Sequence, residues 1–167
     1  PSNSGNALAW LHIPQNAKIP VIGATATATE ITTRYAKEPQ NYMFRVSMVD
    51  REQVALLAAY AVKASKNKKI AIIADSTGYG QAGIKDAAEV LEMHGVKPVL
   101  IEKFGPKDTD ITSQMTKIKN AGADAVIIYA IADGAANVVK SMEKINYFPV
   151  TLGTWGNLSS LYYRMTG

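Results

Sequence analysis

Residues 69–94 read KIAIIADSTGYGQAGIKDAAEVLEMH, and this stretch decides the fold class. Its first six residues, Lys69–Ala74, form a short apolar run rich in Ile, which is typical of a strand buried on both faces of a parallel sheet. In Tyr79–His94 the apolar residues recur at helical spacing, and Gly95 is placed to end that helix in a left-handed conformation. A buried strand followed by an amphipathic helix predicts one strand–helix unit of an α/β protein.

The same alternation continues on both sides of this unit. Helical spacing of apolar residues predicts further helices over Asp50–Ser65, Asp110–Ala121 and Asp133–Asn146. Short apolar runs predict further strands over Val96–Phe104, Ala123–Ala130 and Pro149–Thr154. Strands that alternate with helices of this length predict an α/β fold with an open parallel sheet, right-handed crossovers and helices on both faces.

The first forty residues are predicted to form a smaller unit. Here Asn6–Ile13 has a helical pattern that Pro14 is expected to end, and Ile19–Ile22 is a predicted strand. Tyr42–Val49 is apolar and extended in character, which predicts a connecting strand. The division between the two units is expected near residues 43–47.

Polar residues are predicted to cap three of these helices. Ser4 precedes the first helix, Asp50 and Gln53 have the spacing of a capping pair, and Asp133 stands where an N-cap residue is expected. Each of these side chains therefore has a purely structural interpretation beside any functional one.

Composition excludes several classes of protein. The chain has 167 residues, of which 47% are hydrophobic and 19% charged, as in one globular domain or slightly more. It has no Cys, which rules out disulfides and thiolate sites, and no apolar run long enough to span a bilayer. The net charge of +4 is mild, and its densest cluster, Lys63–Lys69, lacks interleaved aromatic residues, so no nucleic-acid partner is expected. The chain starts without Met or a signal sequence, so we expect a piece of a longer protein.

Gly78–Gly83 (GYGQAG) matches G-x-G-x-x-G after a strand and at the start of a helix. Glu102 lies near the end of the next strand, where a dinucleotide fold places its ribose carboxylate, but Asp75 would set a negative charge beside the pyrophosphate. Three interpretations stay open. The motif serves an NAD-type enzyme, or its glycines only pack a helix, or the helix start and Tyr79 bind the polar end of a small ligand.

Five polar or aromatic residues follow the carboxyl ends of predicted parallel strands, where open α/β sheets bind ligands: Thr25, Thr27, Tyr79, Asp133 and Trp155. The threonine hydroxyls and nearby N–H groups suit a carboxylate, although β-propensity alone also explains a Thr-rich run. Trp155 suits either a pocket wall or the core. None of the five is an evident nucleophile, base or metal ligand, so we predict no catalytic residue, no metal and no cofactor, and a site that holds a molecule without transforming it.

Five segments, in order and near the expected spacing, resemble the periplasmic solute-binding proteins of ABC transporters, in particular the branched-chain amino-acid (Leu/Ile/Val) binding type. They are IPVIGATATATEIT, YMFRVSMVDREQ, KKIAIIADSTGYGQAG, FGPKDTDITSQMTKIKNAGADAVIIYA and TLGTWGN. The resemblance implies two α/β lobes joined by crossovers. It assigns residues 1–41 to the end of the first lobe, 42–47 to a crossover, 48–156 to the second lobe, and 157–167 to a helix that leads toward the remainder.

The resemblance also implies roles for individual residues. Ser4 and the Thr25–Thr27 stretch, which includes Ala26, match first-lobe positions that bind a ligand's carboxylate and amino group. Tyr79 and Asp133 match or adjoin second-lobe contacts. Trp155 stands where amino-acid binders place an acidic residue for the ligand ammonium. This departure favours a carboxylate ligand without an ammonium group, such as an aromatic acid, unless Asp133 supplies the charge.

The implied function is the extracytoplasmic solute-binding component of an ABC transporter, which captures an amino acid or related small carboxylate by hinge closure. The implied partners are that ligand and a membrane permease. The implied location is periplasmic or extracellular, membrane-associated if a lipid anchor is attached. A ligand-sensing receptor domain with the same fold is an alternative. A dimer is also expected to form through the exposed sheet edge of the truncated fold.

Overall fold

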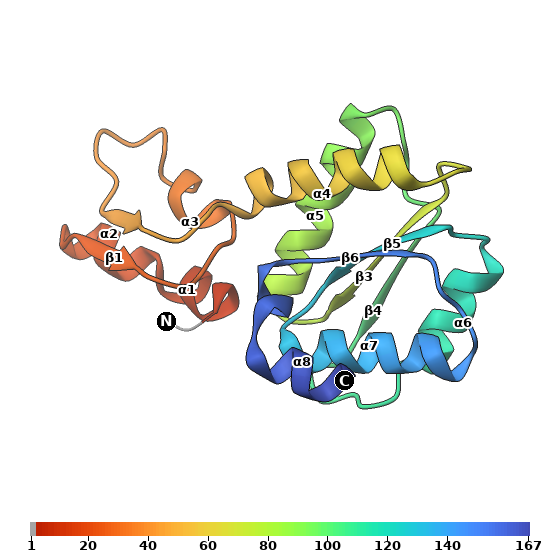
Figure 1. The fold of residues 1–167 in the computed structure, drawn as a ribbon. Helices are drawn as coiled ribbons and strands as arrows, with labels where there is room; N and C mark the ends of the chain where they lie inside the picture. The colour runs from red at the N-terminus through yellow and green to blue at the C-terminus, as the bar shows by residue number, and fades with distance from the viewer. Residues whose placement is uncertain (1–2) are drawn as a thin grey trace.

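The computed structural model describes residues 3–167, which form a large and a small unit side by side (Figure 1). The large unit is built on a parallel sheet with strand order β4-β3-β5-β6. Its strands are β3 (Ile70–Asp75), β4 (Leu100–Phe104), β5 (Ala125–Tyr129) and β6 (Val150–Gly153). The predicted fold class is confirmed, since each strand is joined to the next by a helix and all neighbours are parallel.

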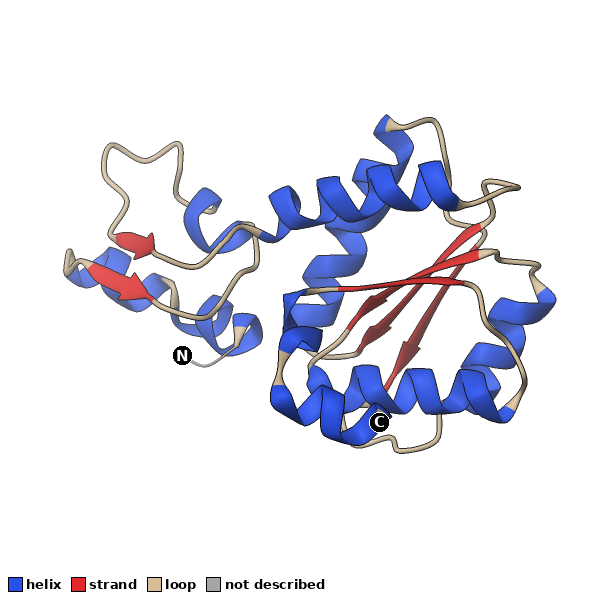
Figure 2. Cartoon of the chain, in the orientation of Figure 1, coloured by secondary structure: helices blue, strands red, loops and turns tan. Residues whose placement is uncertain are grey.

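Helices cover both faces of this sheet (Figure 2). The four are α4 (Asp50–Ala64), α5 (Gly78–Met93), α6 (Thr112–Asn120) and α7 (Ala132–Lys144). Successive residues of β3 face opposite sides, so Ile70 and Ile72 pack with α4 and α5, while Ala71 and Ile73 pack with α6 and α7. The central strands β3 and β5 are buried throughout, which explains why they read as continuous apolar runs.

The small unit consists of short elements. They are α1 (Ser4–Trp10), α2 (His12–Ala17), β1 (Val21–Gly23), α3 (Glu30–Thr33) and β2 (Met43–Arg45). β1 and β2 pair in parallel, and a separate apolar cluster with Leu11, Ile31 and Met43 at its centre holds the unit together. The chain ends with η1 (Trp155–Leu158) and α8 (Ser160–Thr166), both packed on α7.

Several predicted details are wrong. Pro14 does not end a helix: it lies in the first turn of α2, where its missing N–H has no helical partner to lose. Only Met43–Arg45 of the predicted connecting strand is a strand, and α3 was not predicted. Ser4 is not an N-cap, because Asn3 caps α1 with its side chain.

The predicted caps of α4 and α7 are also wrong. Val49 and Ile131 occupy the N-cap positions, and neither helix has a capping side chain. Asp50 and Asp133 lie one and two residues further on, inside the first turn, where an acidic residue complements the helix dipole instead. Gly95 does adopt the left-handed conformation expected of it, with φ of 73°.

Candidate functional site

A cleft of about 240 Å³ lies where the small unit meets the large one. It is lined by Asn3, Ser4, Thr25, Ala26, Thr27, Tyr79, Ile131, Ala132, Trp155, Gly156 and Ser159. Six of the seven predicted ligand-binding residues therefore come together, and Asp133 does not join them. Within residues 3–167, those that line the cleft include no acidic, basic or histidine side chain. The cleft thus offers hydroxyl groups, backbone groups and apolar surface without a formal charge.

Ser4 connects the first helix to the loop after β1. Its Oγ accepts hydrogen bonds from the backbone N–H groups of Thr27 at 3.3 Å and Ala28 at 3.1 Å. The hydroxyl carries one proton as well as two lone pairs, so Ser4 keeps its own proton for a further acceptor. A hydroxyl buried at the cleft wall in this way suits a ligand that accepts hydrogen bonds.

Trp155 connects the two units. Its backbone N–H donates to Oε1 of Gln53 at 3.0 Å, which fixes the start of η1 against α4. Its indole Nε1 donates to Oγ1 of Thr27, in the small unit, at 3.4 Å. Trp155 is 39% exposed and lines the cleft, so it is available to a ligand. Trp155 therefore belongs to the cleft wall and not to the core, which answers the alternative left open by the sequence.

Tyr79 forms the floor of the cleft and has only 5% of its surface exposed. Its hydroxyl donates to Thr154 Oγ1 at 2.9 Å, and its ring lies 4.8 Å from that of Tyr129. Burial raises the pKa of Tyr79 well above its usual value, so the phenol stays neutral. With its hydroxyl already bonded, Tyr79 offers a ligand mainly its ring.

Asp133 points its carboxylate back to its own helix. Oδ1 accepts the N–H of Gly134 at 2.9 Å. Its neighbours Ile131 and Ala132 line the cleft in its place. A carboxylate that would neutralise a ligand ammonium is therefore not supplied at the cleft wall by Asp133.

Steric reasons account for each glycine of the Gly78–Gly83 motif. A Cβ on Gly80 would lie 2.0 Å from the backbone oxygen of Asp75, and one on Gly83 would lie 2.1 Å from the Tyr129 ring. A Cβ on Gly78 would lie 2.6 Å from Cα of Gly5, in the small unit. The motif therefore serves close packing, inside the large unit at two positions and between the units at the third.

The surroundings of the motif do not favour a dinucleotide. The buried carboxylate of Asp75 accepts the N–H groups of Thr77 at 3.0 Å and Ile131 at 3.2 Å, so it occupies the turn where a pyrophosphate would need donors. Glu102, the expected ribose ligand, instead pairs with Lys117 at 3.2 Å. The enzyme interpretation has no support in this geometry.

Asp50, for which the sequence predicts only a capping role, is a buried carboxylate behind the cleft. No hydrogen bond of ordinary geometry reaches either of its oxygens from residues 3–167. Burial raises its pKa, and the nearby hydroxyls of Thr27 and Tyr129 counter part of this rise. An Asp at a predicted helix start is usually a cap, so the sequence carried no signal of this environment.

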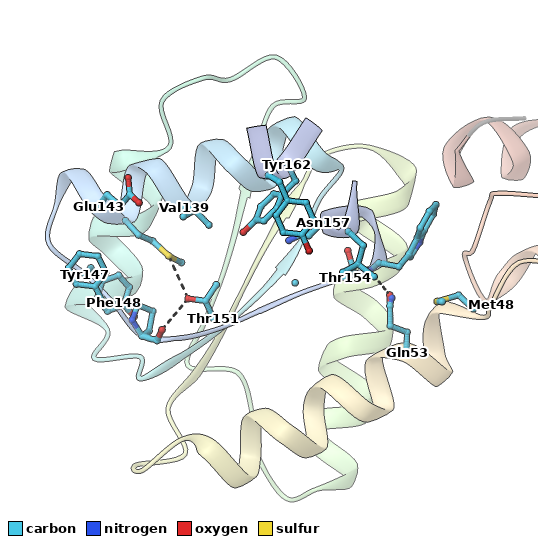
Figure 3. Close-up of a pocket in the computed structure, with 16 residues that line it drawn as sticks. Met48, Gln53, Val139, Glu143, Tyr147, Phe148, Thr151, Thr154, Asn157 and Tyr162 are labelled. Atoms are coloured by element: carbon cyan, nitrogen blue, oxygen red, sulfur yellow. Dashed lines mark hydrogen bonds between the residues drawn. The ribbon is translucent and has the colours of Figure 1, made fainter. Parts of the chain in front are cut away.

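A larger hollow of about 620 Å³ lies along the outer edge of β6 (Figure 3). Met48 and Gln53 lie at one end and Tyr147 and Phe148 at the other, and its wall is mainly apolar. Among the described residues β6 pairs with β5 alone, which leaves this edge open. The hollow shares Trp155 with the cleft but contains none of the other predicted ligand-binding residues. We therefore place the candidate site in the smaller cleft.

A profile of the family described as periplasmic binding protein matches residues 1–161. The chain belongs to the periplasmic binding protein family.

Curated relatives of this binding protein carry branched-chain amino-acid names. Leu/Ile/Val-binding protein homolog 3 of Brucella melitensis is 27% identical over 148 residues, which are 88% of this chain and 39% of the relative. Leu/Ile/Val-binding protein homolog 7 of Brucella suis is 31% identical over 163 residues, 94% of this chain and 41% of the relative. The chain thus spans about two fifths of the length of each of these two relatives.

Solved structures of periplasmic binding proteins have the same fold. A type 1 protein from Bordetella pertussis superposes with a TM-score of 0.88 at 24% identity, covering 100% of this chain and 45% of that one. A Thermus thermophilus protein with bound valine gives 0.82 at 22% identity, covering 98% and 42%. A Rhodopseudomonas palustris protein in complex with 4-hydroxybenzoate gives 0.77 at 23% identity, covering 95% and 42%. At these identities the likeness concerns the fold.

Membership of this family agrees with the prediction of a binding protein that is not an enzyme. The name of the family also agrees with the predicted location outside the cytoplasm. Among the described residues, no helix combines the length and apolarity needed to cross a membrane.

Proposed function

We propose that this protein is the extracytoplasmic solute-binding component of an ABC transporter. In this proposal residues 1–41 are the end of one lobe, 42–47 a crossover, 48–156 most of the second lobe, and 157–167 the helix leading out of it. The ligand occupies the cleft between the units, and a membrane permease accepts the loaded form. The names of the relatives and the family membership support this proposal.

The observation that carries it is the position of Trp155. This residue belongs to the large unit, lines the cleft with an accessible face and bonds Thr27 of the small unit. A ligand placed there touches both units at once. Such a ligand favours the closed arrangement over an open one, which is the differential contact that hinge closure requires.

The ligand is a small carboxylate. Its carboxylate accepts a hydrogen bond from the Ser4 hydroxyl and lies near the Thr25–Thr27 loop, while its apolar body rests on the Trp155 ring. A cleft of about 240 Å³ is smaller than the roughly 300–1,000 Å³ of sites for drug-sized molecules, which suits a ligand of amino-acid or benzoate size.

Within this class we favour an acid without an ammonium group. The described cleft wall lacks a carboxylate, and an unpaired ammonium forgoes a charge-assisted hydrogen bond worth about 1.5–3 kcal/mol. An aromatic acid uses the Trp155 face instead, by stacking. The complex of 4-hydroxybenzoate with a protein of this fold supports that choice, and the complex with valine in another keeps amino acids as the alternative.

Isothermal titration of the full-length protein tests the proposal. We expect saturable binding of one molecule of 4-hydroxybenzoate or benzoate, and weaker binding of leucine and valine. Tighter binding of the amino acids would overturn the preference within the class. Binding of a sugar or of NAD with no response to any carboxylate would overturn the proposed function itself.

The free edge of β6 is the expected dimer contact of this chain taken by itself. Light scattering across a range of concentrations measures this, and a mass that stays monomeric at high concentration would count against it.

A further inference from the structure

The side chain of Arg45 holds most of the loop Ala26–Thr29, at the cleft wall, from behind. Its Nη1 donates to the carbonyl oxygens of Thr27 at 2.8 Å and Ala28 at 2.9 Å. Its Nη2 donates to the carbonyl oxygen of Thr29 at 3.3 Å and to Thr32 Oγ1 at 2.6 Å. One guanidinium on β2 therefore binds three successive carbonyl groups of the loop.

Two further donors act on the same side. The hydroxyl of Ser47 donates to Ala26 O at 2.8 Å, and the N–H of Asp50 donates to Thr27 O at 2.9 Å. The segment from Arg45 to Asp50 thus donates the hydrogen bonds that the carbonyl groups of the loop accept. Because a trans peptide unit holds its C=O and N–H in opposite directions, the N–H groups are directed the other way.

Ser4 lies on the side of the loop to which these N–H groups are directed. The peptide unit that joins Ala26 to Thr27 bonds Ser47 through its carbonyl and Ser4 Oγ through its N–H. The next unit bonds Arg45 through the carbonyl of Thr27 and Ser4 Oγ through the N–H of Ala28. Each unit is thus bonded at both ends, and the second runs from a cation to the hydroxyl at the cleft wall.

The hydrogen bonds within such a chain polarise one another. A positive charge at the carbonyl end strengthens the N–H donor, and that donor in turn makes the Ser4 hydroxyl a stronger donor to an anion. The described cleft wall itself has no cationic side chain, and Arg45 does not line it. The charge of Arg45 therefore acts from outside the cleft wall, and its hydrogen-bonded path to the cleft runs through the peptide units and Ser4.

The surroundings of Arg45 are consistent with a charged guanidinium. Burial lowers its pKa, while Asp50 and Glu52 raise it, and an Arg side chain stays protonated in proteins. Asp50 is one potential counter-charge, but burial raises its pKa and opposes its ionisation.

From this geometry we infer that Arg45 is a positioning residue that gives the cleft its preference for an ionised carboxylate, by aligning and polarising the peptide units between Ala26 and Ala28 and through them the Ser4 hydroxyl. The inference rests on the proposed function, because it presupposes a carboxylate in the cleft. It adds a residue outside the cleft wall and a reason why a site without a cation selects an anion.

The test compares acids with their amides, which have nearly the same shape but lack the negative charge of the carboxylate. The affinities of the full-length protein are measured by titration for 4-hydroxybenzoate and 4-hydroxybenzamide, and for leucine and leucinamide. In Arg45→Met we expect the affinity for the bound acid to fall by about tenfold to a hundredfold, as for a lost interaction with a charged group, and the affinity for the amide to change much less.

Two variants complete the design. Arg45→Lys keeps the charge but not the fork that binds three carbonyl groups, so we expect it to restore part of the preference for the acid. Arg34→Met removes another arginine of the small unit, whose partners are Glu30 and the carbonyl oxygen of Leu8, and should leave the ratio unchanged. If Arg45→Met does not fold, the acid-to-amide ratio of Arg45→Lys decides the test.

Equal loss of acid and amide affinity in these variants would show that Arg45 only supports the loop, and would overturn the inference while leaving the proposed function intact. Unchanged affinity for both would overturn it in the same way. Failure of the unaltered protein to bind any of the acids would instead overturn the proposed function, and this inference with it.

Discussion

Trp155 and Thr27 lie 128 residues apart in the chain, yet the indole Nε1 of one donates a hydrogen bond of 3.4 Å to the hydroxyl oxygen of the other. The N–H of Thr27 also donates to Ser4 Oγ, and its carbonyl oxygen accepts hydrogen bonds from the Arg45 guanidinium and the N–H of Asp50. The small unit, the connecting segment and the far end of the large unit therefore meet at one residue. Changes at this junction should affect ligand binding more than they affect the core of either unit.

Trp155→Ala should weaken ligand binding strongly. It removes the aromatic face and the bond to Thr27, so we expect a loss of about 2 kcal/mol or more in binding free energy, the range of an aromatic anchor. Trp155→Phe keeps a ring and should lose less. Leu158→Ala, also on η1 and 73% exposed, serves as the control and should bind normally. Equal affinities of Trp155→Ala and the unaltered protein by titration would remove Trp155 from the site.

Tyr79→Phe should separate stability from binding. The change leaves the Thr154 hydroxyl without its donor in a buried place, which costs about 1–3 kcal/mol of unfolding free energy. The ring that a ligand meets is retained, so the dissociation constant should stay within about a factor of three, well under the tenfold that 1.4 kcal/mol represents. Urea unfolding and titration give the two values, and a large loss of affinity at unchanged stability would mean that the hydroxyl contacts the ligand.

Gly78→Ala should disturb the contact between the units. Its Cβ would lie 2.6 Å from Cα of Gly5, so one unit must move away from the other. We expect weaker ligand binding with little loss of stability in the large unit. Gly83→Ala is the matched variant, because its Cβ meets the Tyr129 ring at 2.1 Å inside the large unit and should cost about 1–3 kcal/mol of stability. Binding unaffected by Gly78→Ala would argue against a site between the units.

Asp50→Asn should change the pH dependence of stability. The pKa of Asp50 is raised by burial, so between its ordinary value of 3.8 and its value in the fold the folded protein binds more protons than the unfolded chain. Stability therefore falls as pH rises through that window, and Asp50→Asn should remove this fall and be at least as stable above it.

Asp110→Asn is the control of opposite sign. Bonds from Thr112 and Lys144 lower the Asp110 pKa to about 2, so its contribution is present above its ordinary pKa and is lost as pH falls toward 2. Urea unfolding from about pH 2 to pH 8 measures both variants. A difference between Asp50→Asn and the unaltered protein that does not vary with pH would show that Asp50 has the same pKa in the folded protein as in the unfolded chain, and would contradict the raised pKa.

The sequence predicted the large unit well because its signals are local. Ile70–Asp75 and Ala125–Tyr129 are buried on both faces and rich in β-branched residues, and Gly95 ends the preceding helix with φ of 73° as its position suggested. The small unit was harder, since β1 and α3 are too short to show a period.

The site was predicted in part for a similar reason. The rule that ligands bind beyond the carboxyl ends of parallel strands selects Thr27 and Trp155 without knowledge of their contacts. It says nothing of Arg45 or Asp50, whose roles depend on which carbonyl groups and hydroxyls the fold brings to them. It also selected Asp133, whose carboxylate turns back to its own helix. Such orientations are set by tertiary contacts, and no spacing in the sequence encodes them.

A crystal structure of the full-length protein with 4-hydroxybenzoate or benzoate tests the central claim most directly. We expect ligand density in the cleft, with the carboxylate within hydrogen-bond distance of Ser4 and the Thr25–Thr27 loop and the ring against Trp155. Density only in the apolar hollow along β6, or a carboxylate turned away from Ser4 and Thr27, would contradict it.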